Sequence, residues 1–281
     1  DFMQTLLQKV ILEDNHSFAC RYYTTPNFET TWHLHEEVEI IVITKGYGTV
    51  MIGDYVAPYN PSDVYFIASN IPHWFRKNNQ CKIGEALVLQ FNANLFSDFL
   101  KQPELKHIDS ALHKNVAFRC NGKLALHVAH QLTTIEQAKK TQRLLLLLAL
   151  LDKLSTSKEI STVTKDFTTS ANVNPAIELV INFSFKHYLT NITLEQAANI
   201  VGMSIPTFCR YFKKNTKKTY FEFLQELRIN HACRLLSTTD KPILTVCYES
   251  GFNSWSHFSK QFKAIKAVTP KTYRNHYKAI G

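Results

Sequence analysis

The sequence predicts a two-domain protein, with a β-rich first domain that ends in helices and an all-helical second domain. The chain has 281 residues, of which 45% are hydrophobic, so two ordinary domains can each form a packed core. Short β-branched and aromatic runs fill residues 16–92, and helical periodicity follows. Residues 172–281 carry 15 Lys and Arg against 6 Asp and Glu, whereas residues 1–171 carry 17 of each. A neutral front and a basic back indicate that the second domain faces a polyanion.

Five strands are predicted in the first domain. Turn material such as Lys45-Gly46, Gly53-Asp54 and Pro61-Ser62 separates runs rich in β-branched and aromatic residues. These runs cover residues 16–23, 37–45, 48–52, 63–69 and 84–91. Several short strands at this spacing are typical of a double-sheet sandwich or a small barrel.

Helices are predicted to follow at residues 94–100, 122–137 and 137–154. The last of these has an apolar second half, residues 144–151, and such a helix must be buried by its own domain or by a partner subunit. The next segment is rich in Ser and Thr and is interpreted as a linker. We therefore expect a first domain over residues 1–154, a linker over 155–173 and a second domain over 174–281.

Composition also excludes several classes of protein. The longest apolar run has eight residues, whereas about 20 are needed to cross a bilayer. The first ten residues lack the pattern of a secretory signal, so a cytoplasmic location is expected. The six cysteines form no CxxC pair, which argues against a zinc ribbon, a redox dithiol or a disulfide scaffold. No glycine-rich phosphate loop is present.

One pattern occurs twice in the second domain, at about residues 194–215 and 243–264, after a helix start at Asn174-Pro175. Each copy has a short helix, a glycine turn at Gly202 or Gly251, an apolar residue, a serine and a second helix. Glycine permits the positive φ of a tight turn, and serine caps the next helix. This is the layout of a helix-turn-helix unit, whose second helix enters the major groove of DNA.

The second helix of each copy separates inward from outward residues. Phe208 and Phe212 in the first, and Phe258 and Phe262 in the second, lie four residues apart and point inward. Trp255 has two open interpretations, a DNA-contacting side chain or a partly buried support. The candidate DNA-binding residues are Pro206, Thr207, Cys209, Arg210, Lys213, Trp255, Ser256, His257, Lys260 and Lys263.

Residues 174–277 resemble the DNA-binding domain of AraC/XylS-type transcriptional regulators. The resemblance implies two helix-turn-helix units, a connecting helix at about residues 220–236 and recognition helices in successive major grooves of double-stranded DNA. This chain departs from the family pattern at Lys217 and Ala267, where glycine is usual, and at Pro206, which cannot donate to a base. The residues that carry the resemblance are Leu194, Ala197, Ala198, Gly202, Ser204, Phe208, Arg210, Phe212, Lys213, Arg228, Ala232, Leu235, Leu236, Gly251, Phe252, Ser254, Phe258, Phe262, Lys263, Thr269, Pro270, Tyr273 and Arg274.

The first domain has a histidine motif, with His33, His35 and Glu39 followed by a later His73. In a strand, His33 and His35 project from the same face. The motif and the turn at residues 61–63 resemble the cupin fold, which occurs both in metal enzymes and in sensor domains. We expect an effector pocket, with a metal site at the same histidines and glutamate as the alternative. The expected pocket residues are His33, His35, Glu39, His73, Trp32 and Trp74.

Together these patterns predict a transcriptional regulator controlled by a small-molecule effector in the barrel. Carbohydrate is the candidate effector class, because aromatic residues lie near the histidine motif. The alternative is a metal-dependent cupin enzyme fused to a DNA-binding module. The AraC resemblance further implies RNA polymerase as a partner and a homodimer formed through residues 137–154, for which an internal core helix is the alternative. No cofactor other than the alternative metal is expected.

Overall fold

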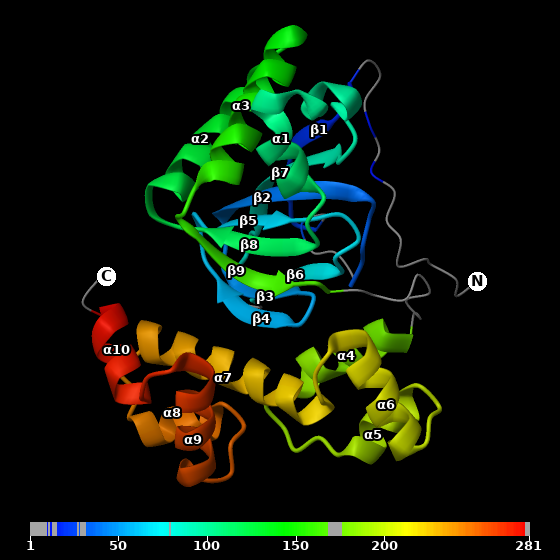
Figure 1. Ribbon diagram of the computed structural model, residues 1–281. Helices are drawn as coiled ribbons and strands as arrows, with labels where there is room; N and C mark the ends of the chain where they lie inside the picture. The colour runs from blue at the N-terminus through cyan, green and yellow to red at the C-terminus, as the bar shows by residue number, and fades with distance from the viewer. Residues whose placement is uncertain are drawn as a thin grey trace. The chain divides into compact units, whose positions relative to one another are not determined.

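The computed structural model describes residues 10, 12, 16–26, 28, 32–78, 80–167 and 176–278. The chain divides into two compact units near residue 172, the first containing the sheets and the second only helices (Figure 1). The predicted helix start at Asn174-Pro175 lies outside the described residues.

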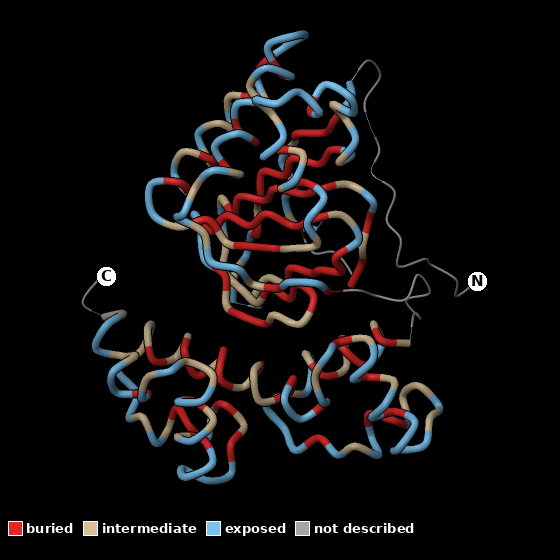
Figure 2. Tube along the Cα trace, viewed as in Figure 1, coloured by how far each residue is buried: buried red, intermediate tan, exposed pale blue. Residues whose placement is uncertain are grey.

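Two β-sheets form the centre of the first unit. The large sheet contains, from edge to edge, β1 (Ala19–Thr24), β7 (Glu85–Asn92), β2 (Glu37–Lys45), β5 (Val64–Ile67), β8 (Val116–Cys120) and β9 (Ile160–Lys165). The small sheet contains β4 (Tyr55–Tyr59), β3 (Gly48–Ile52) and β6 (His73–Lys77). The six consecutive central residues of β2 and of β7 are buried, which requires that both faces of the large sheet are covered there (Figure 2).

Four strands were missed from the sequence, and one of them corrects the predicted linker. Residues 160–165 form β9, which pairs antiparallel with β8, so the linker expected over residues 155–173 is wrong for this segment. Its sequence, ISTVTK, is rich in β-branched residues, which suit the exposed edge of a sheet as well as they suit a polar loop. Strand β4 contains Pro58 and lies at the edge of the small sheet, where a missing amide donor is tolerated.

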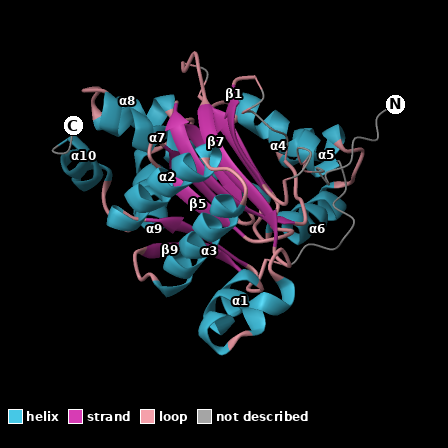
Figure 3. Cartoon of the chain, turned by 90° about the horizontal axis from the view of Figure 1, so that it is seen from above, coloured by secondary structure: helices cyan, strands magenta, loops and turns pink. Residues whose placement is uncertain are grey.

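Helices cover the large sheet on one face. After the 3₁₀ turns Ser97–Lys101 and Pro103–Leu105 come α1 (Lys106–Leu112), α2 (Gly122–Gln137) and α3 (Thr141–Thr156). Helix α2 packs against β1, β5 and β7, and α3 packs against α1 and α2 (Figure 3).

The helix predicted over residues 137–154 is wrong at its start, because α2 ends at Gln137 and α3 begins at Thr141. Between them Lys140 has a φ of 52°, which no helix continues. Within the single chain α3 is buried on one side only, so the burial of its other side by a partner subunit stays a prediction. Leu147 and Leu151 are buried within the unit, whereas the side chain of Leu145 is 62% exposed.

Seven helices make up the described part of the second unit: α4 (Ala176–His187), α5 (Leu194–Ile200), α6 (Ile205–Thr216), α7 (Tyr220–Thr238), α8 (Ile243–Glu249), α9 (Trp255–Lys266) and α10 (Pro270–Lys278). The predicted connecting helix is α7, whose buried residues are shared between two small cores. No described helix is long and apolar enough to cross a membrane. All six cysteines are free, and four of them are buried.

Candidate nucleic-acid interface and histidine cluster

The turn between α5 and α6 has the conformation that the sequence predicts. Gly202 has a φ of 62°, and open space surrounds the position that a Cβ would occupy there. Helix α5 begins with a capping box, in which the Thr193 hydroxyl accepts from the Gln196 amide and the Gln196 side chain accepts from the Thr193 amide. Ser204 precedes α6, but its hydroxyl bonds to Thr207 Oγ1 at 3.0 Å and does not cap a backbone amide.

The turn between α8 and α9 repeats this geometry in a more crowded setting. Gly251 has a φ of 82°, and a Cβ there would lie 3.1 Å from backbone atoms of Leu189 and from Nε of Arg228. Phe252 is buried beneath the turn, and Ser254 Oγ accepts from the amide of His257 at 3.3 Å. Both copies of the sequence pattern therefore fold as helix-turn-helix units.

The inward phenylalanines fix the rotation of α6 and α9. Phe208 and Phe212 are fully buried, and each ring centroid lies 5.2 Å from that of Tyr220 on α7. Phe258 and Phe262 are also fully buried, with ring centroids 5.6 Å apart. Because these positions define the inner face of each helix, the opposite face must lie at the surface.

All ten candidate DNA-binding residues are exposed on α6 and α9. None of the four cations among them, Arg210, Lys213, Lys260 and Lys263, forms a salt bridge with the described residues. Trp255 is 41% exposed and its ring centroid lies 5.6 Å from that of Phe258, so the side chain packs on the core, and its contact with DNA stays a prediction. The two helices thus present unpaired positive charge to solvent.

The helices α6 and α9 end in the left-handed conformation without glycine. Lys217 has φ 60° and ψ 6°, and Ala267 has φ 59° and ψ 3°. Each amide bonds at 2.9 Å to the carbonyl four residues earlier, Lys213 or Lys263. The turns therefore close as they would with glycine, at the energetic cost that a Cβ carries in this region.

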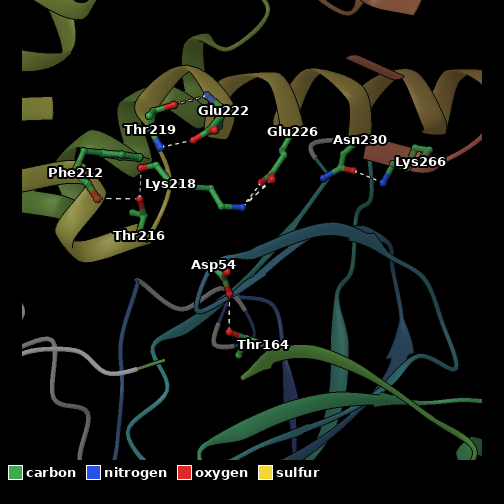
Figure 4. Close-up of polar contacts among 10 residues, drawn as sticks. All are labelled: Asp54, Thr164, Phe212, Thr216, Lys218, Thr219, Glu222, Glu226, Asn230 and Lys266. Atoms are coloured by element: carbon green, nitrogen blue, oxygen red, sulfur yellow. Dashed lines mark hydrogen bonds and ion pairs between the residues drawn. The ribbon is translucent and has the colours of Figure 1, made fainter. Parts of the chain in front are cut away.

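Polar contacts hold the turn after α6 and the last turn of α9 against α7. Lys218 Nζ donates to both carboxylate oxygens of Glu226 at 2.7 Å, and Thr219 forms a capping box with Glu222 at the start of α7 (Figure 4). On the side of α9, Lys266 Nζ donates to Oδ1 of the buried Asn230 at 2.9 Å (Figure 4). These contacts anchor the α6–α7 turn and the C-terminal end of α9 to the shared α7.

In the first unit the predicted histidines converge into one buried cluster. His33 and His73 form an isolated β-bridge, with backbone hydrogen bonds of 3.2 and 2.9 Å. One nitrogen from each of His33, His35 and His73 lies within 4.8 Å of the others. Glu39 completes the cluster, with Oε2 3.2 Å from His35 Nε2 and Oε1 3.5 Å from His73 Nε2.

Gln90 belongs to this cluster and was missed in the sequence. It lies directly opposite Glu39 in the β2–β7 pair, and its Nε2 donates to Glu39 Oε2 at 2.7 Å. The available signal was one polar residue inside the apolar run ALVLQF, which cannot be distinguished from a surface position without the register. Gln90 is buried, so its role is to hold the carboxylate in place.

The charges in the cluster are strongly coupled. Burial by itself raises the pKa of Glu39, but the imidazoles of His73 and His35 outweigh it, and the pKa of Glu39 falls to about 2. Burial lowers the pKa of His35, but its hydrogen bond and charge interaction with Glu39 prevail, and the pKa rises above its ordinary value. Burial lowers the pKa of His73, against the opposing charge of Glu39.

The donor set fits a divalent metal ion. Nδ1 of His35 donates to the carbonyl of Glu37 at 3.0 Å, and Nδ1 of His73 donates to the carbonyl of Ile71 at 2.8 Å. Each of these bonds leaves Nε2 directed at Glu39, and His73 Nε2 has no hydrogen-bond partner within the described parts of the chain. Metal-binding histidines characteristically donate their second ring nitrogen to a carbonyl in this way. His33, His35, His73 and Glu39 would be the ligands.

The two tryptophans expected in an effector pocket are core residues. Trp32 is 1% exposed and Trp74 is 3% exposed. Neither ring therefore offers an open face on which a sugar could stack in this structure. The aromatic argument for a carbohydrate is correspondingly weakened.

Comparison with known proteins supports both units. A helix-turn-helix domain family matches residues 197–276, and a cupin domain family matches residues 22–89. The chain is 23% identical to the uncharacterized HTH-type transcriptional regulator YdeC of Bacillus subtilis, over 86% of this chain and 85% of that protein. It is 23% identical to the HTH-type transcriptional activator RhaS of Mannheimia succiniciproducens, over 98% and 97%.

A crystal structure of the DNA-binding domain of AdpA with a target DNA matches 38% of this chain and 95% of that domain, with 29% identity and a TM-score of 0.36. The two matched domain families occupy the two units in chain order, and the relatives that match nearly the whole chain are named as transcriptional regulators. The chain is an AraC-family transcriptional regulator, with a cupin domain followed by a helix-turn-helix domain.

Proposed function

We propose that this DNA-binding regulator is controlled by a small molecule that binds in the cupin unit, in the cytoplasm. The observation that carries the proposal is the histidine–glutamate cluster buried in the barrel of a chain whose other unit presents two recognition helices. Control of this kind requires that the effector binds two arrangements of the protein with different affinity.

On the DNA side, Arg210 and Lys260 occupy equivalent positions on α6 and α9. Arginine suits bidentate contact with guanine or a phosphate, and lysine acts as a less directional cation. Pro206 lies in the first turn of α6 and has no amide donor, so the first unit reads fewer bases than the second.

Salt-dependent binding tests this assignment. Selection from genomic fragments would first supply an operator, and fluorescence anisotropy would then compare Arg210→Ala and Lys260→Ala with the wild type. Each variant should reduce the salt slope by about 1 if its cation contacts a phosphate, or relax one base position if it reads an edge. Lys271→Ala, an exposed cation on α10, is the matched control. Unchanged binding in both variants at every salt concentration would contradict the assignment.

On the sensing side, His33 and its partners are the proposed effector contacts. His33→Ala should leave basal operator binding intact and alter the response to the effector. Carbohydrate is the first class to test, by isothermal titration of the whole chain against a panel of sugars. Absence of binding across the panel would remove carbohydrate from the proposal without affecting the DNA-binding assignment.

A metal-dependent enzyme fused to a DNA-binding module is the second candidate, favoured by the donor set around Glu39. A bound metal ion would supply a Lewis-acid position to which an oxygen of a small molecule could coordinate. Elemental analysis of the purified protein distinguishes the candidates. A tightly bound equivalent of iron, manganese or zinc, lost in His35→Ala, would favour the enzyme, and metal-free protein that binds its effector would favour the sensor.

Assembly and polymerase contact belong to the same proposal. Helix α3 leaves Leu144 36% and Leu145 62% exposed, an open apolar face that a second copy of the chain would cover. Leu145→Lys should convert a dimer to a monomer in analytical ultracentrifugation, whereas Leu126→Lys, at a 69% exposed position on α2, should not. RNA polymerase is the proposed partner at the promoter.

A further inference from the structure

A second cleft lies outside the histidine cluster, between the start of β1 and the turn that joins α2 to α3. Its volume is about 240 Å³, and Phe18, Ala19 and Cys20 from the strand side form one wall. Residues 136–139 and Arg143, from the two helices, form the other wall. None of the residues of the histidine cluster lines it.

Arg143 is the unusual feature of this cleft, because its side chain is charged and only 8% exposed. Its guanidinium lies over the ring of Phe18, 4.5 Å from the centroid. It donates to the carbonyls of Phe18 at 3.2 Å and Ile135 at 3.4 Å. These two contacts use two of its five N–H donors, and no carboxylate among the described residues forms a salt bridge with it.

The remaining charges on the lining are also predominantly positive. Arg21 and Lys139 contribute two more cations, against the single carboxylate of Glu136. The adjacent Cys20 thiol does not offset them, because burial raises its pKa to about 12 and keeps it neutral. Arg143 has no charged partner among the residues that the structure describes, a buried cation in that state is costly, and a bound anion would remove most of the cost.

We propose that this cleft binds a small oxyanion-bearing metabolite, whose carboxylate or phosphate group is held by Arg143. The planar guanidinium suits bidentate contact with either group, and Lys139 at the rim adds a second positive charge. The volume of about 240 Å³ suits a compact molecule. Arg143 lies in the first turn of α3 and bonds to the carbonyls of Phe18, just before β1, and of Ile135, near the end of α2. An anion bound to Arg143 would therefore act directly on α3, the helix proposed to form the dimer.

Isothermal titration of the full chain tests the proposal, with sodium phosphate in one arm and sodium succinate and benzoate in the other, at constant ionic strength. We expect saturable binding below about 10 mM in one arm, and the arm identifies the oxyanion. Arg143→Lys keeps the charge but loses the bidentate fork, so the affinity should fall by about tenfold or more. Lys139→Gln, at an exposed position, should weaken binding by about threefold.

The controls separate this site from the rest of the protein. Lys153→Gln removes an exposed cation of α3 that does not line the cleft, and should leave the affinity unchanged. His33→Ala should bind the oxyanion as the wild type does. No saturable binding in either arm would overturn the proposal, as would equal affinities of the wild type and both cleft variants.

Discussion

The left-handed residue after α9 allows a quantitative prediction about stability. Ala267 has φ 59° and ψ 3°, a conformation in which a Cβ costs about 1–2 kcal/mol. Replacing it with glycine removes that cost but gives the unfolded chain more freedom, which offsets about 0.4–1 kcal/mol. Ala267→Gly should therefore stabilise the second unit by about 0.5–1 kcal/mol. Lys217→Gly, at φ 60° after α6, should act in the same direction.

Hydrogen exchange measured by mass spectrometry at increasing urea concentrations reports this change within the full chain. Slowly exchanging amides of α7 should gain about 0.5–1 kcal/mol of protection in Ala267→Gly. The double variant should show about the sum of the two single effects, because the turns lie in separate helix-turn-helix units.

Matched controls are available three residues earlier in each helix. Ala264→Gly and Lys214→Gly place the same glycine at exposed helical positions, where it should destabilise by about 0.5–1 kcal/mol. Glycine should therefore change the free energy of unfolding in opposite directions at two positions only three residues apart, because only the second position has a positive φ. If Ala267→Gly destabilised the unit as much as Ala264→Gly does, the reasoning from φ would be refuted.

Two further predictions concern the same unit. Gly251→Ala should destabilise the second unit by about 2 kcal/mol or more, because the new Cβ would lie 3.1 Å from the backbone of Leu189. Gly202→Ala should cost only about 1 kcal/mol, from the positive φ, because open space surrounds its Cβ position. Urea titrations should therefore show the larger loss of stability for Gly251→Ala. Burial, and next the charge of Arg234, lower the pKa of His231 to about 4, below its unfolded value of about 6.5. Its neutral form therefore contributes stability that is present above pH 6.5 and is lost as the pH falls toward 4, and His231→Gln should flatten that loss; an unchanged pH profile in this variant would disprove the role of His231.

The second unit could be predicted from the sequence nearly element by element. The paired glycine turns and the buried phenylalanines are local signals, separated by four to eleven residues, and they fix both the boundaries and the rotation of α6 and α9. The orientation of Trp255 was left open, because a first-turn aromatic can be half exposed and still pack on Phe258.

The first unit was less predictable because its contacts are long-range. The HxHxxxE motif identified the histidine cluster, but the contribution of Gln90 depends on the register between β2 and β7. The burial of Arg143 could not be predicted either. A basic residue in a helix is usually exposed, and only the folded structure shows that this one is buried against Phe18. Strand β9 was missed because its edge position makes it polar on one side.

The length of helix α7 sets the distance between the two recognition helices. Its 19 residues span about 28 Å at 1.5 Å per residue, somewhat less than one turn of B-DNA. Its first half packs on the core around Phe212 and its second half on the core around Phe262. An insertion of one residue near its middle would rotate one half against the other by about 100°, and both helices could then no longer meet the same side of a duplex. In the proposed DNA complex, the distance between the two contacts on the operator therefore depends on the length of α7, a helix with no proposed contact to a base.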